Sequence, residues 1–191
     1  MRAVFFDVGE TLVDETGMWE RAADAAHVPR FTLMGVVGGL AARGERHDRV
    51  WEILGVERPP AASWGPGDFY PDALRCLADL RSRGFLVGAA GNTAASAEEG
   101  LRKVVDVVGS SERWGVEKPA DGFFARIVET AGVPSDEIAY VGDRVDNDVR
   151  PALSAGMKAV HVVRGPWGYL HATPPGAVAV EGLDGLAEVI L

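Results

Sequence analysis

Charged side chains follow short apolar runs at well-separated places in this sequence. Asp7 comes directly after an apolar run near the N-terminus, and Asp143 and Asp148 follow another in the C-terminal half. Carboxylates from two separate loops repel each other unless a cation lies between them, and oxygen-rich sites of this kind suit Mg²⁺. Lys118, from a third loop, would add the positive charge that an anionic phosphoryl group requires.

Each of these features taken alone has an ordinary structural explanation. Asp7 could cap a turn, and the segment from Asp143 to Asp148 could be a solvated loop that caps the helix beginning near Val149. A Lys-Pro dipeptide such as the one at Lys118 is common on protein surfaces. Their order along the chain, each at the end of an expected strand or helix, favours a shared site over coincidence.

Short apolar runs predict five β-strands, with amphipathic helical patterns between most of them. Over Pro71–Arg83 and Asp121–Ala131 the apolar residues share one helical face, and Gly84 and Gly132 follow as C-terminal caps. We expect Asp121 to cap the N-terminus of its helix. This alternation predicts an α/β fold with a parallel sheet covered by helices on both faces. The expected strands are Ala3–Phe6, Phe85–Ala89, Val104–Val108, Ile138–Val141 and Ala159–Val163.

In an open parallel sheet, ligands bind outside the carboxyl ends of the strands, near the point where the strand order reverses. Gly91, Asn92 and Thr93 follow the second expected strand, so we expect them beside Asp7 and Asp143. The residues that end the strands therefore have to be considered as one set.

Residues 16–70 interrupt the alternation of strands and helices. Helical stretches over Trp19–Ala26 and Met34–Leu54 lead into a Pro- and Gly-containing loop, Glu57–Phe69, and no clear strand pattern is present. We expect a helical insertion between the first and second strands, with Trp19, Phe31, Met34 and Trp51 packed in its own core. The expected division is a core domain of residues 1–15 and 71–191 and a helical cap of residues 16–70.

Composition limits the class of partner. The chain has 191 residues, 47% of them hydrophobic, and a net charge of −9, which disfavours nucleic acid and anionic membranes as partners. The single cysteine, Cys76, rules out an intramolecular disulfide, and its helical spacing among apolar residues predicts an inert buried thiol. No signal peptide or membrane span is expected, so we predict a cytoplasmic protein with a small-molecule substrate. The oligomeric state is left open.

The sequence resembles the haloacid dehalogenase (HAD) superfamily of hydrolases over essentially its whole length. The segment Phe5–Leu12 is similar to the first motif of that family, and Lys118-Pro119 to the third. Val141–Asp148, continuing into Ala155-Gly156-Met157, is similar to the fourth and is the most specific match. The resemblance implies a Rossmann-like core with a helical cap inserted after the first strand, and this cap is shorter than is usual in the family.

The resemblance also implies roles for the site residues. Asp7 would attack phosphorus and form an aspartyl-phosphate that water then hydrolyses. Mg²⁺ would be bound by the carboxylates of Asp7 and Asp143 and by the backbone carbonyl of Gly9. Asp148, or alternatively Asp146, would hold the water shell of the metal. Lys118 would neutralise the nucleophile and the phosphoryl oxygens, and Asn92 with nearby backbone N–H groups would bind those oxygens.

Two positions depart from the family pattern. Family phosphatases usually carry a second aspartate, the general acid and base, where this chain has Gly9. Losing such a group typically costs about 10²–10⁴ in rate, so a slow phosphatase or one reserved for good leaving groups is expected. Glu10 points elsewhere if the local backbone is extended, and Asp14, Glu15 or His47 are conceivable substitutes. The Ser/Thr of the second motif falls at Gly91, with Thr93 as a stand-in.

Three alternatives follow from these departures. Phosphonate cleavage requires a cap lysine, and residues 15–70 contain none. A 2-haloacid dehalogenase would use Asp7 without a metal, but the Gly142-Asp143 loop resembles the metal-binding type. A catalytically impaired member that binds a phosphorylated ligand or a protein stays open because of Gly9 and Gly91. The leading prediction is a Mg²⁺-dependent HAD-like hydrolase acting on a phosphate monoester.

Overall fold

A computed structural model describes residues 1–60 and 63–191 of the chain. Six parallel strands form one sheet in the order β3-β2-β1-β4-β5-β6. The strands are β1 (Ala3–Phe6), β2 (Leu86–Gly91), β3 (Val107–Ser110), β4 (Ile138–Gly142), β5 (Lys158–Val162) and β6 (Val178–Val180). This is the predicted α/β, Rossmann-like fold, and the strand order reverses between β1 and β4.

Helices cover both faces of the sheet, and each face has its own apolar core. On one face, α4 (Ala73–Ser82) and α10 (Leu186–Ile190) pack against alternate side chains of β1, such as Val4 and Phe6. On the other, α7 (Asp121–Ala131) and α8 (Arg150–Ser154) pack against Phe5. The alternation arises because successive side chains of a strand point to opposite faces. Short helices complete the periphery: α5 (Glu98–Leu101), α6 (Ser111–Trp114) and α9 (Gly165–Leu170).

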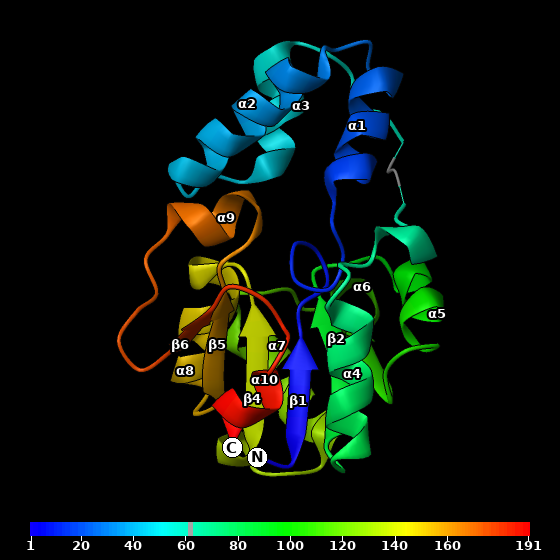
Figure 1. Cartoon of the computed structure of the whole chain (residues 1–191). Helices are drawn as coiled ribbons and strands as arrows, with labels where there is room; N and C mark the ends of the chain where they lie inside the picture. Colours follow the sequence, from blue (N-terminus) through cyan, green and yellow to red (C-terminus); the bar gives the residue numbers. More distant parts are fainter. Residues whose placement is uncertain (61–62) are drawn as a thin grey trace.

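Three helices lie between β1 and α4 in the chain: α1 (Thr16–Ala25), α2 (Arg30–Ala42) and α3 (Val50–Leu54). Figure 1 shows them above the carboxyl ends of the strands, while both chain termini lie at the opposite end of the molecule. They share a separate apolar cluster that includes Leu33, Leu40 and Trp51, and Trp167 of α9 packs into it. The division into core and cap domains stays a prediction, although this arrangement agrees with it.

Several expected boundaries differ from the structure. The third strand begins at Val107 because Val104 belongs to the turn after α5, and β6 was not predicted. The helical stretch expected over Met34–Leu54 is interrupted: α2 ends at Ala42, Gly44 follows with a left-handed φ of 66°, and α3 begins at Val50. Asp121 does not cap α7, since the capping position is Ala120 and Asp121 is the first helical residue.

Phe31 is the other incorrect assignment. Its side chain is 90% exposed, whereas we expected it in the core of the insertion with Trp19, Met34 and Trp51. The inner face of α2 is formed by Leu33, Val37, Leu40 and Ala41, and a residue two positions before Leu33 points away from that face.

In the part of the chain that the structure describes, none of the helices has the length and apolar character that a membrane span requires.

Candidate active site

The strand ends at the reversal point bring the acidic residues together. β1 and β4 are hydrogen-bonded neighbours, so the residues that follow them, Asp7 and Asp143, leave the sheet side by side. The backbone N–H of Asp7 donates to Val141 O at 2.8 Å, which continues the ladder by one residue and fixes where the Asp7 side chain starts. A π-helical turn, Val145–Val149, then carries Asp148 back toward the strand end.

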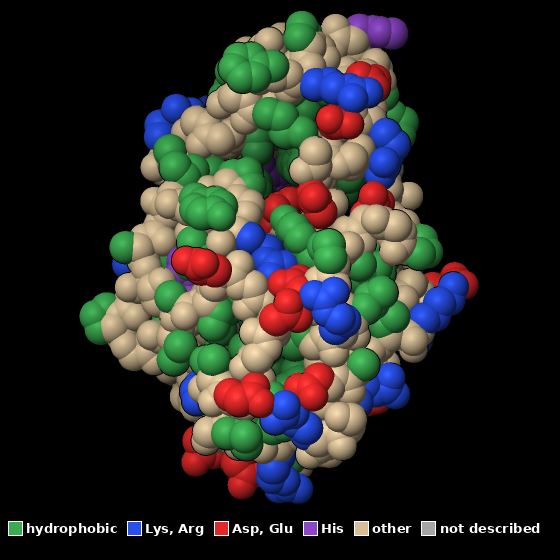
Figure 2. All heavy atoms as spheres, in the orientation of Figure 1, with side chains coloured by type: hydrophobic (Ala, Val, Ile, Leu, Met, Phe, Trp, Pro, Cys, Tyr) green, Lys and Arg blue, Asp and Glu red, His purple; other side chains and the backbone are tan. Residues whose placement is uncertain are grey.

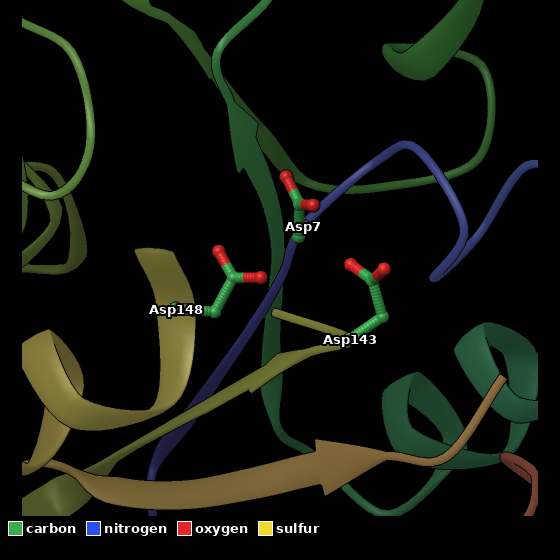
Figure 3. Close-up of side chains that lie close together, drawn as sticks. All are labelled: Asp7, Asp143 and Asp148. Carbon is green, nitrogen blue, oxygen red and sulfur yellow. The ribbon is translucent and has the colours of Figure 1, made fainter. Parts of the chain in front are cut away.

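Asp7, Asp143 and Asp148 form a buried carboxylate cluster. Their ligand oxygens lie within 4.8 Å of one another, and the three residues are 8%, 1% and 0% exposed. Figure 3 shows the three carboxylates directed toward a common space at the end of β1. Gly142 is required beside them, because a Cβ there would lie 2.5 Å from Cγ of Asp148. Asp146 instead is exposed and pairs with Arg144 at 2.7 Å, so Asp148 is the residue that joins the cluster.

Lys118 lies against this cluster. Its Nζ donates to Oδ1 of Asp7 and to Oδ1 of Asp148, both at 2.6 Å, and the residue is 4% exposed. Burial acts to lower the pKa of Lys118, but the adjacent carboxylates of Asp148 and Asp7 outweigh it and raise the pKa well above its ordinary value. The ammonium is therefore charged and holds one oxygen of each carboxylate.

The cluster carries more negative than positive charge. Three carboxylates share one ammonium, and Oδ2 of Asp143 is buried without a hydrogen-bond partner among the described residues. Burial, followed by the charges of Asp148 and Asp7, raises the pKa of Asp143 well above its ordinary value. Burial also raises the pKa of Asp148, to about 6. Such mutual repulsion is what a bound cation would relieve.

Asn92 positions Lys118 through the backbone. Oδ1 of the Asn92 side chain accepts from the backbone N–H of Lys118 at 2.7 Å, and Nδ2 of the same side chain donates to the backbone carbonyl of Lys118 at 3.0 Å. This pair of bonds was not predicted, since the family resemblance implied only that Asn92 binds phosphoryl oxygens. One side-chain amide hydrogen of Asn92 is therefore bonded to the Lys118 carbonyl. The Asn92 side chain holds the loop that carries Lys118 in position.

Gly91 and Thr93 lie near Asp7 and differ in what they leave open to a ligand. A Cβ at Gly91 would lie 2.7 Å from Oδ1 of Asp7, so a side chain at this position would collide with the carboxylate that Lys118 holds. Thr93 lines the same cavity as Asp7, and its Oγ1 is buried without a hydrogen-bond partner among the described residues. An unused hydroxyl of this kind is available to a ligand.

Two cavities open between the sheet end and the helices α1–α3. One, of about 480 Å³, is lined by Asp7, Lys118 and Asp143 among others. The second, of about 700 Å³, is lined by aromatic residues that include Trp19, Trp51 and Trp64. Figure 2 shows acidic and basic side chains gathered where these helices meet the rest of the molecule. The acidic cluster therefore faces a space of small-molecule size.

Comparison with known proteins decides the family. The family model for haloacid dehalogenase-like hydrolases matches residues 1–156. The chain belongs to this family. As a HAD-like hydrolase, it shares its fold with the L-2-haloacid dehalogenase of Xanthobacter autotrophicus, at a TM-score of 0.70 and 20% identity over 100% of this chain and 98% of that one.

Two of the curated relatives that match this chain illustrate the similarity to phosphatases. The glyceraldehyde 3-phosphate phosphatase of Methanopyrus kandleri is 38% identical over 104 residues, which are 51% of this chain and 45% of the relative. The protein of the same name from Methanothermobacter thermautotrophicus is 26% identical over 85% of each chain. This HAD-like hydrolase thus matches less than half the length of the first of these relatives.

Near Gly9, the structure of this HAD-like hydrolase differs from the family pattern in a specific way. A Cβ built on Gly9 would lie 2.3 Å from Oε1 of Glu15, so the Glu15 carboxyl occupies the space that a side chain at position 9 would need. Burial, and then the charge of Glu10, raises the pKa of Glu15 to about 7. Glu15 is the first residue before α1, and the sequence indicated it only as one conceivable substitute.

Other acidic groups near Gly9 are engaged in structural contacts. Glu10 adopts a left-handed φ of 52°, and its carboxylate accepts from the Tyr70 hydroxyl at 2.7 Å and from the Glu15 N–H at 2.9 Å. Asp14 accepts from the Thr16 N–H at 2.9 Å and is not among the lining residues of either cavity. Glu10 lines the smaller cavity, but its carboxylate is engaged in these two hydrogen bonds, and Asp14 lies outside both cavities.

His47 lies on the cavity side of the helices. Its ring stands edge-on between Trp19, at 5.6 Å between centroids, and Trp167, at 5.9 Å. Burial lowers the pKa of His47 from its ordinary value, with a further contribution from Arg144, so the ring is neutral at neutral pH.

Proposed function

We propose that this HAD-like hydrolase is a phosphatase that acts on small phosphate monoesters with the help of Mg²⁺. The observation that carries the proposal is the buried cluster of Asp7, Asp143 and Asp148 around the ammonium of Lys118. Curated relatives named for glyceraldehyde 3-phosphate support a phosphate monoester as the substrate class. Cavities of about 480 and 700 Å³ beside the cluster suit a small substrate.

The residues of the cluster fit a divalent cation. Oδ2 of Asp143 is buried and has no hydrogen-bond partner within residues 1–60 and 63–191, and the carboxylate oxygens of the cluster are ligands of the kind that Mg²⁺ prefers. Asp7 and Asp143 would hold the ion through their carboxylates, Gly9 through its backbone carbonyl, and Asp148 through the water shell. When bound, the ion supplies positive charge to the phosphoryl oxygens and to the crowded carboxylates.

The chain's own residues account for the covalent step. Lys118 binds Oδ1 of Asp7, which leaves Oδ2 of Asp7 to attack phosphorus. This attack forms an aspartyl-phosphate, breaks the bond from phosphorus to the ester oxygen and releases the alcohol. Water then attacks the same phosphorus and releases phosphate. Lys118, the Thr93 hydroxyl and backbone N–H groups from Gly91 to Thr93 would bind the phosphoryl oxygens, with Asn92 holding the lysine loop in place.

The experiment is hydrolysis of p-nitrophenyl phosphate by the purified protein, with Mg²⁺ or with EDTA. We expect turnover only with Mg²⁺, and a loss of turnover in Asp7→Asn that circular dichroism shows to be folded. Asp136→Asn is the matched control, because Asp136 is exposed and precedes β4 at the opposite edge of the sheet. It makes the same chemical change away from the cluster and should leave turnover unchanged.

Two results would contradict the proposal. Release of chloride from 2-chloropropionate in EDTA, abolished by Asp7→Asn, would identify a dehalogenase, whose fold this chain shares. Stabilisation by vanadate and Mg²⁺ in thermal unfolding, with no hydrolysis across a panel of phosphate monoesters, would identify a protein that binds phosphorylated ligands without turning them over.

A further inference from the structure

Glu15 differs from the other acidic residues that line the Asp7 cavity. Apart from Asp7 and Asp143, the other carboxylates have a hydrogen-bond or ion-pair partner. These pairs are Glu10 with Tyr70, Asp48 and Glu117 with Arg46, and Asp146 with Arg144. Within residues 1–60 and 63–191, no basic side chain forms an ion pair with Glu15, and its carboxylate accepts only from the Trp19 indole. An unpaired carboxyl in a cleft beside a nucleophile is a candidate for proton transfer.

The position of the Glu15 carboxyl is defined by Gly9. A Cβ on Gly9 would lie 2.3 Å from Oε1 and 2.7 Å from Cδ of Glu15. The space beside Gly9 can therefore hold the Glu15 carboxyl or a side chain on residue 9, but not both. Gly9 lies two residues after Asp7, and all three residues line the same cavity. Glycine at position 9 therefore admits a carboxyl from the start of α1 to the immediate neighbourhood of the nucleophile.

Two hydrogen bonds hold this arrangement. The Glu15 backbone N–H donates to Oε1 of Glu10 at 2.9 Å, which anchors the residue before α1 begins. One helical turn later, the Trp19 indole donates to Oε2 of Glu15 at 3.3 Å. Because Trp19 binds Oε2, the other oxygen, Oε1, is the one that approaches Gly9.

We propose that Glu15 is the acid and base of the phosphatase reaction, an inference that rests on the function proposed above. As Asp7 attacks phosphorus, the bond from phosphorus to the ester oxygen breaks, and that oxygen takes the proton of the Glu15 carboxyl and leaves as an alcohol. The Glu15 carboxylate then removes a proton from the water that attacks the aspartyl-phosphate. The bond from phosphorus to Asp7 breaks, which returns Asp7 as a carboxylate, releases phosphate and leaves Glu15 protonated again.

The decisive measurement compares two aryl esters that present the same ring to the site, phenyl phosphate and p-nitrophenyl phosphate. Phenolate is the more basic leaving group, so its departure depends on a proton donor. In Glu15→Gln, which retains an oxygen for the Trp19 bond, we expect kcat/KM for phenyl phosphate to fall about 10²–10⁴-fold and that for p-nitrophenyl phosphate to fall far less. We also expect a burst of about one p-nitrophenol per enzyme followed by slow turnover, because water activation is lost.

Control variants separate this role from a structural one. Glu52→Gln makes the same change at an exposed position of α3 and should behave as wild type. His47→Gln tests a second proton carrier that lines both cavities and should preserve the ratio of the two esters. Equal losses on both esters in Glu15→Gln, or the leaving-group effect appearing in His47→Gln instead, would overturn the assignment.

A second pair of variants tests the shared volume directly. Glu15→Ala removes the carboxyl, and Gly9→Asp in that background supplies one from position 9 into the vacated space. We expect the double variant to hydrolyse phenyl phosphate at least about tenfold faster than Glu15→Ala, within the range of a positioned acid. No gain in the double variant would contradict the inference. If wild type hydrolyses neither ester with Mg²⁺, the proposed function itself fails, which is a different result from a failure confined to Glu15.

Discussion

Replacing Lys118 with methionine removes the ammonium that contacts Asp7 and Asp148 and keeps an unbranched side chain. Coulomb's law with an effective dielectric constant of about 20 gives about 6 kcal/mol for each pair at 2.6 Å. The cost of burying the ammonium, several kcal/mol, opposes this attraction, and breaking a buried pair costs about 3–5 kcal/mol in measured cases. We therefore expect the free energy of unfolding of Lys118→Met to be lower than that of wild type by about 3–5 kcal/mol.

The assay is urea denaturation followed by far-ultraviolet circular dichroism, at neutral pH and in EDTA so that no metal compensates for the lost charge. Lys103→Met is the matched control, because Lys103 is exposed, and its free energy of unfolding should stay within about 0.5 kcal/mol of wild type. Lys118→Met combined with Asp148→Asn should recover part of the loss, since it removes a carboxylate left unpaired. A value for Lys118→Met as close to wild type as that of the control would refute the electrostatic argument.

Two further predictions concern residues away from the carboxylate cluster. Burial raises the pKa of the Cys76 thiol to about 12, so about one thiol in 10⁴ is ionised at pH 8, and Ellman's reagent should label Cys76 only after unfolding; rapid labelling of the folded protein would contradict this. Asp72 accepts from Arg164 at 2.6 and 3.1 Å and from the Leu183 N–H at 2.8 Å, so Asp72→Ala should lower the free energy of unfolding by about 3 kcal/mol in urea. The matched change in an exposed pair, Asp184→Ala, should cost at most about 1 kcal/mol, and equal losses would show that burial of the Arg164 pair is unimportant.

The local hydrophobic pattern was sufficient to predict the α/β architecture and most of its strands and helices. Strands such as Ala3–Phe6 and helices such as Asp121–Ala131 were predicted with their observed bounds, since hydrophobic periodicity directly reflects which face is buried. The three-residue strand β6 was missed because its residues Val178 and Ala179 are exposed and carry little burial pattern. Phe31 was misplaced for the reverse reason, since an apolar type does not reveal which side of α2 faces the core.

The residue types that form the site could be identified from the sequence alone. In a parallel sheet, carboxylates that follow two neighbouring strands must emerge at one edge, so Asp7 and Asp143 could be grouped before any coordinates were known. Which of Asp146 and Asp148 faces inward was decided by the π-helical turn, whose effect on side-chain direction has no local sequence signature.

The group that occupies the space beside Gly9 and the partner of Asn92 became known from the folded arrangement of the chain. Both depend on contacts between segments whose relative placement is set by packing: the start of α1 against the loop after β1, and the loop after β2 against Lys118. A sequence specifies which chemical groups are available through residue type and local periodicity. The distances among those groups depend on how the helices pack on the sheet. That packing is a property of the whole core and not of any one segment.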